Sequence, residues 1–153
     1  MEHDRIALIT GANRGIGLAT ARGLAQTGAT VVTVCRDQAS GRAAATSINK
    51  MVGREACTVI VANLASQDSI RRAASEFCEQ YDRLDVLVNN AATISHRRQL
   101  TEDGFELQFG VNHLAPFTLT LSLLDRLRAA DCARIINVSS DAHRRVAMDF
   151  EDL

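Results

Sequence analysis

Short apolar runs alternate with longer stretches of helical periodicity along the whole chain of 153 residues. Runs rich in Val, Ile and Leu predict strands at Arg5–Thr10, Thr30–Cys35, Cys57–Val61, Asp85–Asn89 and Arg134–Val138. Apolar periodicity predicts helices at Gly15–Gln26, Ser40–Met51, Gln67–Tyr81 and Thr101–Arg128, with Gly28 as the C-cap of the first helix. Continuously apolar strands separated by helices are typical of a parallel sheet covered on both faces. The pattern therefore predicts one α/β domain over residues 1–153, a doubly wound sheet of the Rossmann type.

A glycine-rich turn joins the first predicted strand to the first predicted helix. Its sequence, Thr10–Gly17, is TGANRGIG. Gly11 allows a sharp turn, and the missing Cβ atoms of Gly15 and Gly17 would let a pyrophosphate approach the helix N-terminus. Such a turn can also serve packing alone, but the strand before it and the helix after it favour a dinucleotide site. The residues expected at this site are Gly11, Asn13, Arg14, Gly15, Ile16 and Gly17.

The end of the second predicted strand is where dinucleotide sites distinguish NAD from NADP. An acidic residue there hydrogen-bonds the ribose 2′-hydroxyl, whereas arginine accommodates a 2′-phosphate. The chain has Cys35, Arg36 and Asp37 at this point, and Arg14 in the glycine loop supplies a second guanidinium. Two arginines directed at one site favour NADP(H). A shift of the strand end by one position would instead bring Asp37 to the ribose and favour NAD.

Composition limits the other classes of function. The net charge is −1, so nothing draws the chain as a whole towards nucleic acid. No apolar stretch is long enough for a signal peptide or a membrane span, and we expect a cytoplasmic protein. The cysteines are widely spaced without a CxxC pair, which predicts reduced thiols and no metal site; they are Cys35, Cys57, Cys78 and Cys132.

Nucleophilic residues cluster after the fifth predicted strand. Ser139 and Ser140 lie close to Asp141 and His143, a composition that would suit a hydrolase. The GxSxG turn of α/β-hydrolases is absent, and the members of a catalytic triad are rarely neighbours in sequence. A hydrolase is therefore the weaker interpretation.

Taken together, these motifs resemble the short-chain dehydrogenase/reductase family. Thr10–Gly17 is similar to the family's TGxxxGIG, and Asn89-Asn90-Ala91 to its NNA motif. Asn112 resembles the family's asparagine of the long helix, and Ser140 the second serine after the fifth strand. The segment Thr101–Phe109 and the triplet at 35–37 are closest to the retinol dehydrogenase-like branch.

The resemblance implies hydride transfer between NADP(H) and a small-molecule carbonyl or alcohol, with a lipophilic substrate in this branch. It assigns Ser140 to orienting the substrate oxygen and Asn112 to holding a water of the proton relay. Asn90 and Ala91 would lie beside the cofactor. Asn63, followed by Leu64, stands where the family usually has the aspartate that bonds the adenine amino group. Two alternatives remain open: Ser140 could be a strand-end cap, and Asn112 could be a helix residue whose side chain is hydrogen-bonded to backbone.

One part of the family pattern is not found. A YxxxK motif supplies the family's acid/base tyrosine and its lysine, but the only tyrosine and lysine here, Tyr81 and Lys50, match nothing in that motif. We therefore expect that the C-terminal part of the fold is missing, that the fifth strand is an exposed edge, and that this chain alone lacks its acid/base. Homo-oligomers are expected only with that missing part. A non-catalytic NADP(H)-binding or interaction protein, and a remnant that does not fold stably, remain as alternatives.

Overall fold

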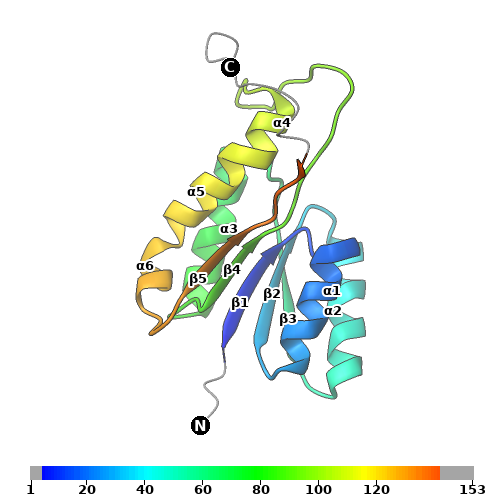
Figure 1. Ribbon diagram of the computed structural model, residues 1–153, viewed down its shortest axis with the longest axis vertical. Coiled ribbons are helices and arrows are strands. Elements are labelled where there is room, and N and C mark those ends of the chain that lie inside the picture. Colours follow the sequence, from blue (N-terminus) through cyan, green and yellow to red (C-terminus); the bar gives the residue numbers. More distant parts are fainter. Residues whose placement is uncertain (1–4, 142–153) are drawn as a thin grey trace.

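A single parallel sheet forms the centre of the molecule. The computed structural model describes residues 5–141, and all its strands belong to one sheet with the order β3-β2-β1-β4-β5 (Figure 1). The strands are β1 (Ile6–Thr10), β2 (Thr30–Cys35), β3 (Cys57–Val61), β4 (Val86–Asn89) and β5 (Arg134–Asn137). In the paired registers Thr10 lies beside Val34, and Asn89 beside Asn137. The strand order reverses direction between β1 and β4, and the carboxyl ends of strands at such a point are where ligands bind in open α/β sheets.

Helices cover both faces of the sheet (Figure 1). On one face lie α1 (Gly15–Gln26) and α2 (Gln38–Val52), and on the other lie α3 (Gln67–Gln80), α5 (Ala115–Ser122) and α6 (Leu124–Arg128). Alternate residues of β1 serve the two layers: Leu8 packs with Phe77 and Leu119, whereas Ile9 packs with Ala21 and Ile48. The doubly wound α/β fold predicted from the sequence is confirmed.

The predicted strands agree with the observed ones to within one residue at each end. Gly28, predicted as the C-cap of α1, lies one position beyond the C-cap Thr27, with a φ of 97°. The N–H of Ala29 donates to the Leu24 carbonyl and that of Gly28 to the Ala25 carbonyl, which is the Schellman arrangement.

The helix predicted over Thr101–Arg128 is wrong in its first part. Residues 101–106 form a tight turn in which Gly104 has a φ of 84°, a conformation that suits glycine. The helical segment begins with α4 (Leu107–Phe109), because the Glu106 carboxylate accepts a hydrogen bond from the Phe109 N–H at 2.8 Å. Backbone hydrogen bonds from Gln108 and then from Phe109 lower the pKa of Glu106.

A π-helical turn, η1 (Gly110–Leu114), separates α4 from α5. It carries Asn112, and Pro116, which has no N–H, lies two residues beyond its end. The carbonyl of Asn112 therefore cannot receive the i+4 hydrogen bond of an ordinary α-helix. Single π-turns of this kind are frequent at functional sites.

Four cysteines in different environments give a test of the packing. Cys35 and Cys57 are buried, Cys78 is partly buried and Cys132 is exposed; burial raises the pKa of Cys57 to about 11. Because the thiolate is the reactive form, we expect an aromatic disulfide reagent at pH 8 to label Cys132 rapidly and Cys35 and Cys57 only after unfolding. Mass mapping of the labelled peptides measures this, and native labelling of Cys57 at the rate of Cys132 would contradict the structure.

Within residues 5–141, none of the helices combines the length and the apolar character needed to cross a bilayer.

Candidate functional site

The glycine loop lies at the carboxyl end of β1, between the sheet and the N-terminus of α1. Gly11 and Gly15 have φ values of 67° and 56°, so both need the freedom of glycine. A Cβ on Gly15 would meet nothing within 4 Å, and the Ile16 side chain is 69% exposed. An open backbone beside the positive end of a helix, with an uncovered apolar side chain, fits an anionic ligand that also carries an apolar surface.

Gly17, buried at the start of α1, is in close contact with other parts of the chain. A Cβ there would lie 2.5 Å from the Asn90 amide nitrogen and 2.6 Å from the Gly11 carbonyl oxygen. Its missing side chain therefore allows the loop to pack against the segment after β4. The sequence could not reveal the contact with Asn90, because Asn90 follows β4 and reaches the loop only through the tertiary fold.

Thr10 fastens the loop to that same segment. Its hydroxyl, in a residue only 3% exposed, accepts hydrogen bonds from the backbone N–H groups of Asn90 and Ala91, each at 3.0 Å. The Asn90 amide donates to the Thr10 carbonyl at 2.9 Å and to the Gly11 carbonyl at 3.3 Å. Asn90 therefore fixes the shape of the loop through its side chain, and with Ala91 it lies beside the expected cofactor site.

Arg14 and Arg36 are both exposed at this edge of the sheet. Arg14 is the N-cap residue of α1, and Arg36 directly follows β2, the strand paired with β1. Among residues 5–141 neither guanidinium forms an ion pair or a hydrogen bond. Two free guanidinium groups after neighbouring strands are suited to a phosphate.

The carboxylate of Asp37 is engaged elsewhere. Asp37 is the N-cap of α2, and its Oδ1 accepts from the Ser40 N–H at 2.8 Å. Hydrogen bonds from Ser40 lower the pKa of Asp37. The strand β2 ends at Cys35 as predicted, so the shift that would have brought Asp37 to a ribose does not occur. The helix was predicted to start at Ser40, and for that reason the cap at Asp37 was missed.

Asn63 and Leu64 follow β3, further along the same edge. The Asn63 Oδ1 accepts from the Ala65 N–H at 3.1 Å, which closes an Asx turn, and the Asn63 N–H donates to the Ser69 hydroxyl. The side chain of Leu64 packs against the core. The carbonyl oxygen expected to accept from an adenine amino group thus already has one donor, and one lone pair remains.

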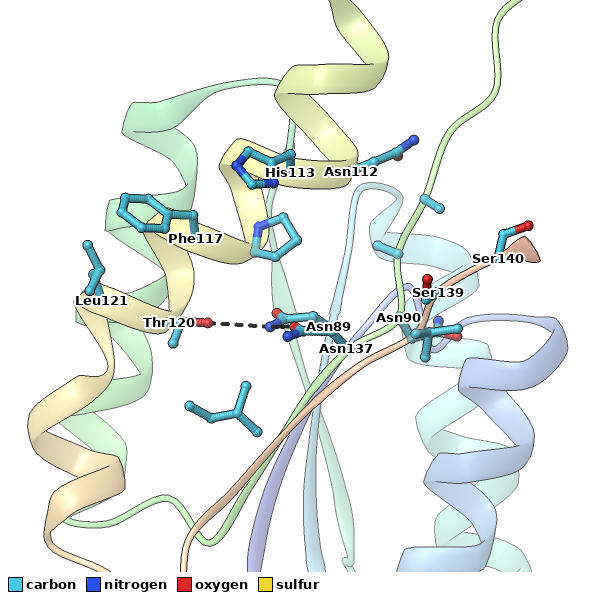
Figure 2. Close-up of a pocket in the computed structure, with 15 residues that line it drawn as sticks. Asn89, Asn90, Asn112, His113, Phe117, Thr120, Leu121, Asn137, Ser139 and Ser140 are labelled. Atoms are coloured by element: carbon cyan, nitrogen blue, oxygen red, sulfur yellow. Dashed lines mark hydrogen bonds between the residues drawn. The ribbon is translucent and has the colours of Figure 1, made fainter. Parts of the chain in front are cut away.

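A cleft of about 900 Å³ opens beyond the ends of β4 and β5 (Figure 2). Ser140 lies on the segment after β5 and Asn112 on η1, and both line this cleft. The apolar part of the wall comes from α5 and β5, through Phe117, Leu121 and Ile135. The structure thus brings the two predicted catalytic residues into one cleft with a largely apolar wall.

The side chain of Asn112 is satisfied by backbone, as the alternative interpretation held. Its Oδ1 accepts from the Thr93 N–H at 2.8 Å and its amide donates to the Thr93 carbonyl at 2.9 Å. This pair of bonds fixes the loop after β4 against η1. Pro116, which has no N–H, cannot supply the i+4 hydrogen bond to the Asn112 carbonyl.

Sequence reasoning missed a polar cluster at the floor of the cleft. The amide of Asn89 donates to Asn137 Oδ1 at 2.8 Å and to the Thr120 hydroxyl at 3.3 Å (Figure 2). Asn89 is 5% exposed, and its own Oδ1 has no partner among the described residues. Only the register of β4 and β5 brings these residues together, although the two asparagines do stand at the ends of consecutive strands.

Among the described residues, no group of three His, Cys, Asp or Glu side chains is arranged to hold a metal ion. His143, which the hydrolase interpretation requires, lies outside the described residues.

The fold and the glycine loop together define the chain as a Rossmann-type α/β domain. A family model described as short chain dehydrogenase matches residues 5–149. The chain belongs to the short-chain dehydrogenase/reductase family of oxidoreductases, as its motifs indicated.

Curated relatives place it in the retinol dehydrogenase-like branch. Human retinol dehydrogenase 13 is 44% identical over 149 residues, which are 97% of this chain and 45% of the relative. Mouse retinol dehydrogenase 12 is 42% identical, over 97% of this chain and 47% of the relative. The chain thus spans about half the length of the relatives it matches.

Solved structures agree with this fold. A protein from Mycobacterium paratuberculosis is 42% identical with a TM-score of 0.77, over 91% of this chain and 47% of that one. A metagenomic short-chain oxidoreductase in complex with NADP is 32% identical with a TM-score of 0.82, over 94% and 66%. A short chain dehydrogenase from Escherichia coli CFT073 in complex with NADPH is 30% identical with a TM-score of 0.81, over 93% and 61%.

Proposed function

We propose that this chain is the cofactor-binding part of an NADP(H)-dependent oxidoreductase that interconverts carbonyl and alcohol groups. The observation that carries the proposal is the edge formed by the glycine loop and the ends of β1 and β2. There the positive end of α1 is open to an anion, and Arg14 and Arg36 are without partners among residues 5–141. Related structures that carry NADP or NADPH support the same ligand.

A bound NADP(H) would supply the hydride acceptor or donor, and the chain's residues would place the substrate. In this proposal Ser140 donates a hydrogen bond to the substrate oxygen in the cleft, and the backbone carbonyl of Asn112 holds a water. Apolar side chains from α5 and β5 favour a lipophilic aldehyde, ketone or alcohol, in agreement with the retinol dehydrogenases among the relatives.

The acid/base of the reaction would come from outside these 153 residues. The phenol of Tyr81 stacks on Phe77 at 4.9 Å and hydrogen-bonds the Thr58 hydroxyl, at the C-cap of α3 and away from the cleft. A phenol acts as a base near neutral pH only when a nearby cation lowers its pKa. Lys50 lies in the last turn of α2, on the face of the sheet opposite to α3 and Tyr81. The position of Tyr81 also favours the second candidate, a non-catalytic NADP(H)-binding protein. Reduction of all-trans-retinal by the isolated chain would contradict both the claim that its acid/base lies elsewhere and the non-catalytic alternative.

Replacement of Arg36 tests the cofactor. Arg36→Glu removes a partner of the 2′-phosphate and adds a repelling charge, so we expect NADPH affinity to fall about 10- to 100-fold while NADH affinity changes little. Isothermal titration of both cofactors measures this. Arg71→Glu, an exposed charge reversal on α3 at the other face of the sheet, is the control for net charge. An Arg36→Glu chain that still prefers NADPH would contradict the assignment.

A further inference from the structure

We infer that Asn13 and Ser40 form a positioning pair that sets cofactor selectivity. Their hydrogen bond fixes the backbones of the two phosphate-binding arginines relative to each other. The inference rests on the proposed function and deepens it: it assigns to Asn13 a role between two protein segments in place of direct contact with the cofactor. The pair links the glycine loop to the first turn of α2, across 27 positions of sequence.

The link is a chain of hydrogen bonds. The Asn13 amide donates to the Ser40 hydroxyl at 3.1 Å, and that hydroxyl donates to the Asp37 carbonyl at 3.2 Å. The Ser40 N–H donates in turn to the Asp37 carboxylate at 2.8 Å. Asn13 and Ser40 are both partly buried, so the bond between them is partly shielded from water, whereas the two bonds between Ser40 and Asp37 are exposed.

Each arginine is adjacent to one end of this link. Arg14 directly follows Asn13, and Arg36 directly precedes Asp37. Both side chains are exposed and neither has a described partner that would fix it, so the backbone on which each stands decides where its guanidinium can reach. A bidentate contact to phosphate tolerates little displacement.

The first turn of α2, to which this link is attached, is itself fixed in position. Gly41 lies where a Cβ would collide with the Cys35 thiol and would come within 2.8 Å of the Val59 side chain, so the first turn of α2 sits directly against β2 and β3. The Asp37 carboxylate is held on the helix cap, away from a competing role at the ribose. The link from Asn13 therefore fixes the loop to a turn of helix that cannot shift inward.

The test is a double-mutant cycle read by titration of NADPH and NADH. Asn13→Ala and Ser40→Ala each remove the link, and we expect each to weaken NADPH binding about 3- to 10-fold with NADH binding within about twofold of the starting chain. The double variant should bind NADPH no more weakly than the weaker single variant, because both changes remove one interaction. Ser40→Thr keeps the hydroxyl and should retain the NADPH preference.

Other outcomes overturn the inference. Equal losses for NADPH and NADH would mean that the pair has only a structural role, and additive losses would mean that the two residues act separately. Thermal unfolding without cofactor shows that each variant is folded, and absence of coupling between the two positions in that measurement would mean that the link does not form. The proposed function fails in a different way, through a starting chain that does not prefer NADPH.

Discussion

Gly17→Ala is expected to destabilise the chain by about 1–3 kcal/mol, although alanine is the better helix former. The added Cβ would lie 2.6 Å from the Gly11 carbonyl oxygen, a backbone atom that cannot rotate away, and 2.5 Å from the Asn90 amide. The loop must then move off β4, so NADPH affinity should also fall by more than about tenfold, as expected for a site displaced by even 1 Å.

Gly23→Ala provides the matched control on the same helix. Gly23 is exposed, and a Cβ there would meet nothing within 4 Å. This variant should gain up to about 1 kcal/mol from helix propensity and bind NADPH unchanged. Urea unfolding of the two variants measures the change in the free energy of unfolding, which should fall for Gly17→Ala and rise for Gly23→Ala. Two changes of the same sign would show that the packing of Gly17 against Asn90 does not control the loop.

Thr10→Val is expected to cost about 3 kcal/mol. Valine has the same shape as threonine but cannot accept the hydrogen bonds from the N–H groups of Asn90 and Ala91. A buried N–H without a partner costs about 1–3 kcal/mol; Thr10 is 3% exposed but both hydrogen bonds are only partly buried, so we expect a total at the lower end for two such groups. The higher strand propensity of valine acts in the opposite direction and is smaller.

Thr10→Ser separates the hydroxyl from the methyl group. Serine keeps the acceptor and loses one methyl, so it should cost about 1 kcal/mol. Denaturant unfolding with equal m-values ranks the two variants. A serine variant less stable than the valine variant would show that methyl packing, and not the two accepted hydrogen bonds, stabilises the junction of β1 and β4.

Most of the fold could be predicted because strands in a covered parallel sheet carry a local signal. Apolar runs such as Thr30–Cys35 and Cys57–Val61 were located without error. The long helix was mispredicted because its apolar spacing continues through the turn at Gly104 and the π-turn at Asn112, where single hydrogen bonds decide the backbone. The capping carboxylate of Glu106 and the missing N–H of Pro116 are visible in the sequence, but only as possibilities.

In the candidate site, too, roles that depend on local sequence could be predicted and contacts that depend on the tertiary fold could not. Local chemistry alone predicts roles for Gly11, Gly15, Arg14 and Arg36, because those roles depend on the residue's own backbone or charge. The partners of Gly17 and Asn112 could not be predicted, because Asn90 and Thr93 reach them through the tertiary fold. The Asn89–Asn137–Thr120 cluster likewise depends on strand register and helix placement.

We propose that the edge formed by the carboxyl ends of β1 and β2 binds NADP(H) in preference to NAD(H). The most direct measurement is thermal unfolding of the unmodified chain alone, with NADPH and with NADH. A ligand at about 100 times its dissociation constant adds about 2.7 kcal/mol of stability, which is a shift of several degrees at this size. We predict a cooperative transition that NADPH raises by several degrees more than NADH does at equal concentration. An equal or larger shift with NADH would contradict the preference for NADP(H), and no shift with either cofactor would contradict the binding site itself.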